Sequence, residues 1–291
     1  MAEVCYEVAQ WKFSLSYDEQ REDVPKLLPQ YRDFRITPQP SDFFLTVVPE
    51  NELDSFSGDE VGQFDCGGAN HGVWRDAAGR YAFAISTPDR SLCCRLHASP
   101  DFKRAQVAPI GDMVHRAFGL NNALMIVFAF FTAPYSTLLL HASTVVKAEK
   151  AYCFLGASGT GKSTHSRLWM DVLQDVVLLN DDNPVLRVNG NEVLIYGSPW
   201  SGKTPCYKQC SYPLGSVVRL AQAPFNRIHP ERKIPAFASL LSACSTMVWD
   251  KRSYDGACAT VAAVVSLSPF YRLECLPDHE AALLCSKTVA S

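Results

Sequence analysis

The stretch GASGTGKSTHSRLW, residues 156–169, decides the fold of the second half of the chain. Its first eight residues fit the pattern GxxxxGK[ST] at every fixed position. The β-like run AYCFL (151–155) precedes it and the helical run THSRLWMDVL (164–173) overlaps its end, which is the context of a phosphate-binding loop. Glycines let the backbone curl so that successive N–H groups form an anion site at a helix N-terminus. The stretch therefore predicts nucleotide binding; the alternative is an ordinary glycine-rich turn from strand to helix.

Two side chains of this loop have defined chemistry. Lys162 reaches the β and γ phosphates of a nucleotide, and the Ser163 hydroxyl ligates Mg²⁺. The expected cofactors are therefore ATP, or a related nucleotide, and Mg²⁺. The predicted nucleotide-binding residues are Gly156, Ala157, Ser158, Gly159, Thr160, Gly161, Lys162, Ser163 and Thr164.

Two adjacent carboxylates end the next β-like run, DVVLLNDD (175–182). A helix of about fourteen residues from Gly161 spans roughly 21 Å, enough to cross the sheet once and return the chain alongside AYCFL. We therefore expect Asp181 and Asp182 beside the phosphate pocket. One of them can hold Mg²⁺ while the other accepts a proton from an attacking hydroxyl. The alternative is that Asp-Asp-Asn-Pro forms only a polar turn.

A predicted hairpin brings a histidine to the same place. If STVV (143–146) pairs antiparallel with AYCFL so that Val146 faces Ala151, His141 falls opposite Gly156 at the mouth of the loop. This register predicts a phosphate-binding or metal-binding role for His141. The alternative is a residue that merely ends a strand.

A second hairpin is predicted at Asn189-Gly190-Asn191. With Val188 facing Glu192, the loop GSPWSGK (197–203) lies beside the two carboxylates. Lys203 can then offset charge on the γ phosphate or on the acceptor; the alternative is a solvated lysine. Weaker candidates for a clamp on phosphate or substrate are Arg167 and Arg219. His165 is expected to cap or pack, and His71 and His97 to be ordinary surface or core residues.

The chain as a whole is expected to be mixed α/β. Residues 1–106 alternate short β-like runs with turns, which predicts a small β-rich N-terminal domain with an antiparallel sheet, of unknown role. Residues 107–134 are predicted to form a connecting helix, and 135–291 the nucleotide-binding catalytic domain. The apolar stretch 123–140 runs for about eleven residues before Pro134, short of the roughly twenty that a membrane span needs. A buried helix ending near Ala133 is therefore expected.

Charge and cysteine content narrow the partners and the compartment. Twenty-seven basic and thirty acidic residues give a formal net charge of −3, without a block of like charges. This excludes the electrostatic footprint of a nucleic-acid or membrane-surface protein and favours small molecules or proteins as partners; a homo-oligomer remains open. Eleven irregularly spaced cysteines are expected to be reduced thiols, and MAEVCYEVAQWKF lacks a secretory pattern, so a cytoplasmic location is predicted.

These motifs together resemble a known family. HAS at 141–143, GASGTGKST at 156–164, NDD at 180–182 and the glycine-bearing loop at 197 resemble, in order and spacing, the catalytic domain of HPr kinase/phosphorylase. More distantly, the chain is similar to the nucleotide half of ATP-dependent phosphoenolpyruvate carboxykinase. The resemblance covers residues 135–290. It implies a PEP carboxykinase-like P-loop domain with a mixed sheet.

The resemblance also implies a function. Nucleotide would bind at 156–164 with Mg²⁺ near Ser163 and the acid pair, Asp181 or Asp182 would match the catalytic base, and His141 the histidine at the loop mouth. The implied reaction is phosphoryl transfer to a serine hydroxyl. WSGK stands where the bacterial kinase has a second glycine-rich loop, and the N-terminal half does not resemble that of the family. Neither carrier-protein specificity nor a hexamer is therefore implied.

We accordingly predict a nucleotide- and Mg²⁺-dependent kinase that acts on a serine or another hydroxyl in a protein, a peptide or a small molecule. Two alternatives stay open at this stage. One is carboxykinase-like chemistry, although the arginines, the metal-binding lysine and the chain length for it have no match in this sequence. The other is a nucleotide-binding sensor or assembly module without turnover.

Overall fold

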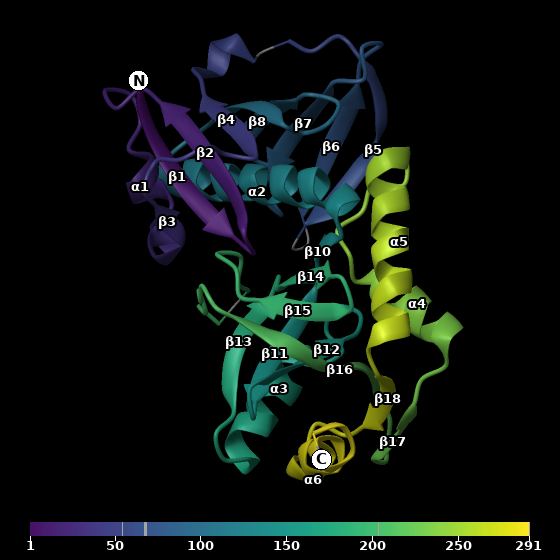
Figure 1. The fold of residues 1–291 in the computed structure, drawn as a ribbon. Coiled ribbons are helices and arrows are strands. Elements are labelled where there is room, and N and C mark those ends of the chain that lie inside the picture. Colours follow the sequence, from purple (N-terminus) through teal and green to yellow (C-terminus); the bar gives the residue numbers. More distant parts are fainter. Residues whose placement is uncertain (54, 67–68, 203, 291) are drawn as a thin grey trace. The chain divides into compact units, whose positions relative to one another are not determined.

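The structure is a computed structural model that describes residues 1–53, 55–66, 69–202 and 204–290. The chain divides into two compact units. Unit 1 comprises Met1–Thr132 with Met247–Lys251, and unit 2 comprises Ala133–Thr246 with Arg252–Ser291. Each unit is built on a large mixed sheet accompanied by helices (Figure 1), so the α/β class predicted from the sequence is confirmed.

Unit 1 is a mixed sheet backed by one long helix. Its strands are β1 (Ala2–Val8), β2 (Trp11–Tyr17), β3 (Arg35–Ile36), β4 (Phe43–Val47), β5 (Asp59–Cys66), β6 (Ala69–Arg75), β7 (Tyr81–Ser86), β8 (Leu92–Ala98) and β9 (Arg104–Pro109). Its helices are α1 (Val24–Leu27), α2 (Met113–Thr132) and the 3₁₀ helices η1 (Pro29–Phe34) and η2 (Glu50–Glu52). The strand order is β3-β1-β2-β4-β9-β8-β7-β6-β5.

The prediction of an antiparallel sheet for residues 1–106 is wrong in part. β4 pairs in parallel with both β2 and β9, while the remaining neighbours are antiparallel. The reason lies in the connections: α1, η1 and β3 intervene between β2 and β4, and four strands intervene between β4 and β9. Connections of this length let the chain re-enter the sheet in the same direction, which a two-residue hairpin cannot do.

The helix α2 forms the core of unit 1. It contacts β7, β8 and β9, and nearly all of its second half is buried. The segment Met113–Tyr135 is long and apolar enough, by length and composition alone, to cross a membrane. It contains a stretch of 18 residues with a mean hydropathy of 1.5, and 78% of that stretch is buried within the protein. Phe130 packs on Phe83 and Phe102 from the sheet side. The helix ends at Thr132, close to the expected end near Ala133.

Unit 2 is a second mixed sheet with helices on both faces. Its strands are β10 (Thr137–Leu139), β11 (Ala142–Lys147), β12 (Lys150–Leu155), β13 (Val177–Asp182), β14 (Val185–Asn189), β15 (Glu192–Tyr196), β16 (Ser211–Gln222), β17 (Arg227–Pro230) and β18 (Phe270–Cys275). Its helices are η3 (Ala133–Tyr135), α3 (Lys162–Val172), α4 (Lys233–Ser242), α5 (Lys251–Leu267, whose first residue belongs to unit 1) and α6 (His279–Val289). The main path is β10-β14-β15-β16-β12-β11-β13, with β18 on β16 and β17 on β18.

Two apolar layers enclose the sheet of unit 2. One joins α3 and α6 to it and is centred on Phe154, Trp169 and Leu273. The other joins α4 and α5 to the opposite face and includes Leu240 and Val261. Because both faces are covered, the central strands read as continuous apolar runs; every residue of β12 after Lys150 is buried.

The two predicted hairpins have different outcomes. In the first, Val146 pairs with Ala151 as expected. In the second, Asn189 pairs with Glu192 and Val185 with Tyr196, so the predicted register is wrong by one residue. Asn189 belongs to the strand, and the turn consists of Gly190, with φ of +59°, and Asn191.

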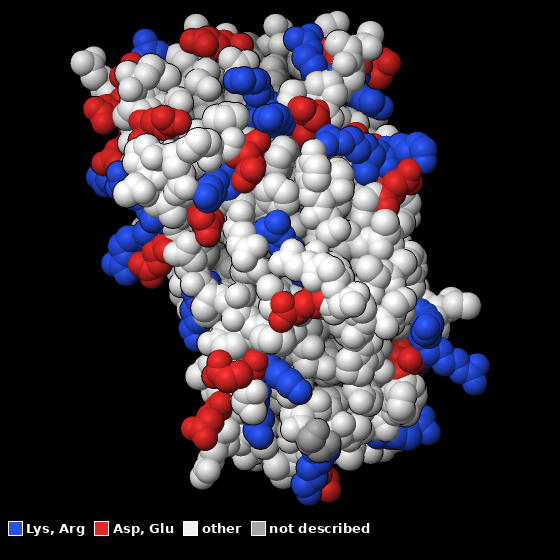
Figure 2. All heavy atoms as spheres, viewed as in Figure 1, with Lys and Arg blue, Asp and Glu red and all other residues white. Residues whose placement is uncertain are grey.

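On the face shown in Figure 2, acidic and basic side chains are interspersed.

Candidate phosphate-binding site

The strand β12 ends at Leu155 and leads into a loop of six residues before α3 begins at Lys162. Gly159 and Gly161 have φ of +78° and +105°, a left-handed backbone that favours glycine. Gly161 is the N-cap of α3 and, having no side chain, makes no capping hydrogen bond to the first turn. The N–H groups at this helix start are therefore available to an anion, and the helix dipole favours one there.

Lys162 lies inside this loop and is 8% exposed. Its Nζ donates hydrogen bonds to the backbone oxygens of Gly156 (3.0 Å) and Ala157 (3.4 Å). Burial lowers the pKa of Lys162, while the charges of Asp182 and Asp181 act to raise it. A phosphate group is a stronger acceptor than these carbonyls, so an ammonium in this position could exchange its carbonyl partners for a phosphate.

The acid pair reaches the loop by a route that differs from the predicted one. The strand β13 pairs antiparallel with β11, not with β12; Asp182 faces Ala142 and Asp181 faces Ser143. Because β11 is also antiparallel to β12, β13 runs in the direction of β12, and both strands end at the same edge of the sheet. The carboxylates therefore lie at the loop edge, one strand further away than expected. The helix α3 spans 11 residues instead of about fourteen.

Asp182 lies in an unusual backbone and electrostatic environment. Its φ is +146°, in the region that favours glycine. His141 Nε2 lies 3.7 Å from Asp182 Oδ1, and Asn183 Nδ2 donates to Oδ2 at 3.0 Å. Burial raises the pKa of Asp182, the positive charges of His141 and Lys162 lower it, and the charge of Asp181 raises it. His141 is thus brought to the acid pair, beside the loop.

A buried polar network fixes the end of β13. The Nδ2 of Asn180 donates to Ser198 Oγ and to the oxygen of Trp200, each at 3.1 Å, and its Oδ1 accepts from Asn183 N at 2.8 Å. Ser198 Oγ also donates to the oxygen of Asn183 at 2.6 Å. Sequence reasoning missed the roles of Asn180 and Ser198. The one pattern that points to Asn180 is a polar residue inside the run VVLLN, where it would need buried partners.

The loop that follows β15 lies against the acid pair. Ser201 forms an isolated bridge with Asp182, and Gly202 N donates to the oxygen of Asp181 at 2.6 Å. A Cβ added at Gly202 would lie 2.9 Å from that oxygen and 3.1 Å from Asp182 Cβ, so the approach requires glycine. Lys203, the predicted charge-offsetting residue, lies outside the described residues.

The remaining candidates are distributed around the loop. Arg167 is exposed on α3, and Arg219 is exposed on β16 where it pairs with Leu155, the residue before the loop. Gln222, which the sequence did not single out, donates from Nε2 to the oxygen of Gly159 at 3.3 Å. His165 packs in the core as expected: its Nε2 accepts from Trp169 Nε1 at 3.1 Å, and burial lowers its pKa to about 4.

The residues at the loop fit a Mg²⁺–nucleotide complex. Among the described residues, no group of three or more His, Cys, Asp or Glu side chains could hold a metal ion. Magnesium bound with a nucleotide needs only one or two protein ligands besides phosphate oxygens and waters. Ser163 is exposed in the first turn of α3, and the raised pKa of Asp182 reflects a carboxylate whose charge a cation would offset.

Comparison with known proteins gives matches among solved structures alone. No protein-family model matches the chain, and no curated protein matches it. Among solved structures, the Hpr(Ser) kinase/phosphatase from Coxiella burnetii is similar at 14% identity, over 52% of this chain and 93% of that chain, with a TM-score of 0.31.

Proposed function

We propose that unit 2 is a P-loop phosphotransferase of the HPr kinase and PEP carboxykinase-like type. It would transfer the terminal phosphoryl group of ATP, or a related nucleotide, to a serine or other hydroxyl in a protein, peptide or small molecule. The observation that carries the proposal is the meeting of Lys162, His141 and the acid pair at the edge of the sheet where the glycine loop begins.

Each group has a role that its surroundings support. The loop amides and Lys162 would bind the nucleotide phosphates, and Ser163 with one carboxylate would hold Mg²⁺. The bound ion offsets phosphate charge, and positioning with such charge compensation supplies most of the catalysis in phosphoryl transfer.

Asp182 is the better candidate for the base. Its side chain is 32% exposed, whereas the Asp181 residue is only 5% exposed, so an acceptor hydroxyl can reach Asp182. Burial raises the pKa of Asp182, and a carboxylate with a raised pKa takes up a proton more readily. His141 and Asn183 contact one carboxylate oxygen each and would fix the orientation of the group.

The experiment compares Asp182→Asn, Asp181→Asn and Lys162→Ala with the full-length wild-type protein. Nucleotide binding is measured calorimetrically with ATP and Mg²⁺, and turnover as ATP hydrolysis and as transfer to a panel of hydroxyl acceptors. We expect Asp182→Asn to bind ATP within about fivefold of wild type but to lose turnover by about 10²-fold or more, the usual size of a general-base contribution.

Asp171→Asn is the matched control, because Asp171 is an exposed carboxylate on α3. It should leave both binding and turnover unchanged, and Lys162→Ala should weaken binding itself. Unchanged turnover in Asp182→Asn would contradict the proposed base. A wild-type protein that binds ATP but transfers nothing would overturn the phosphotransferase and leave a nucleotide-binding module.

A further inference from the structure

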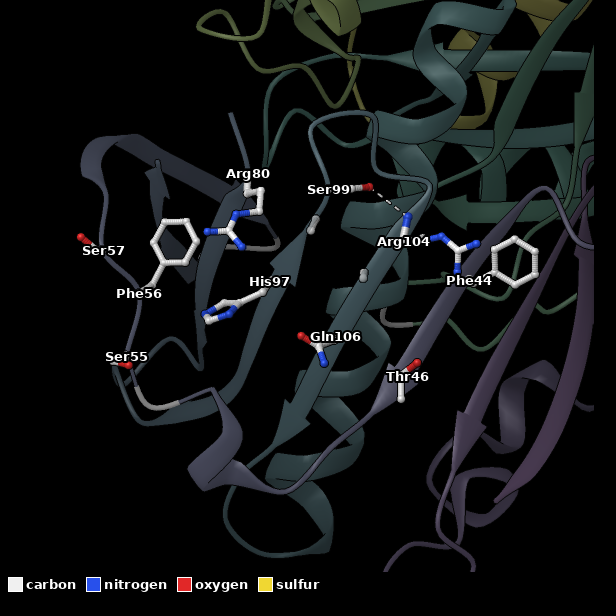
Figure 3. A pocket seen from close by; sticks show the side chains of 12 residues that line it. Phe44, Thr46, Ser55, Phe56, Ser57, Arg80, His97, Ser99, Arg104 and Gln106 are labelled. Atoms are coloured by element: carbon white, nitrogen blue, oxygen red, sulfur yellow. Dashed lines mark hydrogen bonds between the residues drawn. The ribbon is translucent and has the colours of Figure 1, made fainter. Parts of the chain in front are cut away.

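A cavity lies in unit 1, on the face of the sheet opposite α2 (Figure 3). Its volume is about 480 Å³, within the range of small-molecule sites. Strands β4, β8 and β9 form its floor, and the segment 55–57 rises on one side. It is lined by Phe44, Thr46, Ser55, Phe56, Ser57, Arg80, His97, Ala98, Ser99, Arg104, Ala105 and Gln106.

Strand register orders the polar lining into two rows. On β9, Arg104 pairs with Phe44 of β4, and its backbone oxygen accepts a hydrogen bond from Ser99 N. Tyr81 of β7 pairs with Ala98 of β8, so the preceding residue, Arg80, lies opposite Ser99. The outer row across the sheet is therefore Arg80, Ser99, Arg104 and Phe44.

Two residues further along, His97 pairs with Gln106, and Gln106 with Thr46. These three residues form the second, inner row, which consists of neutral hydrogen-bonding groups. Each lies two residues along its strand from a member of the outer row, so both rows lie on the same face of the sheet. Figure 3 shows His97, Gln106 and Thr46 along the floor.

The two arginines are two strands apart, which is roughly 9.5 Å in the direction of the ladder. Arg80 contacts Asp76 through Nε at 2.6 Å, and a guanidinium has five N–H donors, so its terminal nitrogens remain as further donors. Figure 3 shows this guanidinium directed toward Phe56 and His97. The guanidinium of Arg80 therefore faces the cavity, although its Nε is paired with Asp76.

Arg104 lies over the ring of Phe44, 5.4 Å from its centroid. An exposed contact of this kind is weak, so the guanidinium can turn toward an anion in the cavity. Among the described residues, the lining contains two cations and no carboxylate. Of the nearby acids, Asp76 is held by Arg80, and Asp101 accepts from Ser99 Oγ at 2.6 Å.

The remaining walls favour a small molecule with a carbon skeleton. Phe56 packs on His97 with ring centroids 5.0 Å apart, which gives the cavity an apolar wall. Burial and the charges of Arg80 and Arg95 lower the pKa of His97, so its ring is a neutral hydrogen-bonding group at pH 7. An extended peptide cannot join this sheet here, because β4, β8 and β9 each have a strand on both sides.

We propose that this cavity binds a small organic oxyanion, a molecule whose carboxylate or phosphate lies between Arg80 and Arg104 and whose body lies over His97, Gln106 and Thr46 against Phe56. The site belongs wholly to unit 1 and is independent of the nucleotide site. It gives unit 1 a ligand-binding role that the sequence did not reveal, since its residues come from five separate segments.

The test uses two probes with the same ring and different anions, phenyl phosphate and phenylacetate, and benzyl alcohol as the neutral control. Calorimetric titrations are made on the full-length protein carrying Lys162→Ala, so that the phosphate loop contributes little to binding. At least one oxyanion should bind below about 10 mM and the alcohol should not, and the tighter probe identifies carboxylate or phosphate as the preferred group.

Arg80→Gln and Arg104→Gln should each weaken that binding about tenfold, since hydrogen bonds between charged groups are lost. The matched control is Arg32→Gln, an exposed arginine of unit 1 that also contacts a carboxylate, Asp33; it should change the affinity less than about twofold.

Arg104→Gln keeps the Arg80–Asp76 ion pair intact, so a loss of binding in that variant does not come from breaking this pair. As a local reporter, Trp74 lines an adjoining cavity of about 200 Å³ that shares Phe56 and His97, and its fluorescence should change on binding. Equal affinity for benzyl alcohol, no binding of either anion at about 10 mM, or wild-type affinity in both arginine variants would overturn the proposal.

Discussion

Asp182 carries three unfavourable features at once. Its φ of +146° is costly for a residue with a side chain, burial disfavours its charge, and the charge of Asp181 lies next to it. A residue in such a backbone conformation costs about 1–3 kcal/mol and persists only where its neighbours enforce it. Here Asn183 and Ser201 do so, through the contacts at the carboxylate and at the backbone. Strain at this position is a reason to place the chemistry there.

Replacing Asp182 by glycine should therefore raise stability while turnover is lost. Glycine removes the backbone strain and the buried carboxylate, although it adds entropy to the unfolded chain, so the expected net gain is about 1 kcal/mol. Urea unfolding of the full-length protein measures it as a rise in the midpoint at constant slope. Asp181→Gly is the control; its removal relieves no such strain and should lower the midpoint. A lower midpoint for Asp182→Gly would contradict the strain.

Residue types could be predicted where one motif contains the whole chemistry. The place of Lys162 and Ser163 at the end of the glycine loop follows from a motif of eight residues, and the place of the acid pair from the end of the next strand. Their roles in binding and catalysis stay predictions. The partners of Asn180 could not be predicted, because Ser198 lies 18 positions away and its approach depends on the path of a loop. Gln222 is a similar case, since its contact with Gly159 joins positions 63 apart.

At the scale of elements, the sequence determines pairing between neighbours better than the order of strands. The register of β11 and β12 was predictable, since a short polar turn leaves one way to align two apolar runs. The β14–β15 register was not, because Asn189 suits either a turn or a strand end. The length of α3 limits the distance between the end of β12 and the start of β13, but it does not determine which strand β13 pairs with.

Packing between α2 and β8 gives a test in which helix propensity and sterics oppose each other. Alanine at Gly119 would favour the helix by about 1 kcal/mol. A Cβ there would, however, lie 2.5 Å from the oxygen of Cys93 and 2.6 Å from Cys94 Cβ. To remove these clashes, the backbone of β8 or of α2 would have to move. Overpacking of this kind outweighs propensity, so Gly119→Ala should destabilise the protein by about 2 kcal/mol in urea.

The same helix supplies the control for that measurement. Val114 is 72% exposed on α2, so Val114→Ala changes propensity without changing packing. Its effect should stay within about 0.5 kcal/mol of wild type. If Gly119→Ala were as stable as Val114→Ala, the close contact between α2 and β8 would be wrong.

At the scale of the whole molecule, the chain returns to unit 1 at a position in the sequence that follows most of the residues of unit 2. The segment Met247–Lys251 belongs to unit 1, where Asp250 Oδ2 accepts from Tyr81 Oη at 2.8 Å across 169 positions. Sequence patterns report local periodicity and cannot reveal such a contact. The parallel pairs of β4 were missed for the same reason, since they depend on connections of many residues.

Two units with separate cores should respond separately to a ligand of one of them. If ATP with Mg²⁺ binds only unit 2, it stabilises that unit by about 2.7 kcal/mol at a concentration of 100 Kd. For a unit of this size the gain corresponds to a rise in Tm of roughly 5–11 °C. Differential scanning calorimetry should therefore show one transition that moves with ATP and one that does not.

Two variants assign these transitions. Tyr81→Phe removes the hydrogen bond that Tyr81 Oη donates to the buried Asp250 carboxylate, and it should lower only the transition that ATP leaves unchanged, that of unit 1. Lys162→Ala should abolish the shift caused by ATP and leave the other transition in place. A single transition that ATP raises and Tyr81→Phe lowers would mean that the units unfold together, so that the returning segment couples the two cores into one cooperative structure.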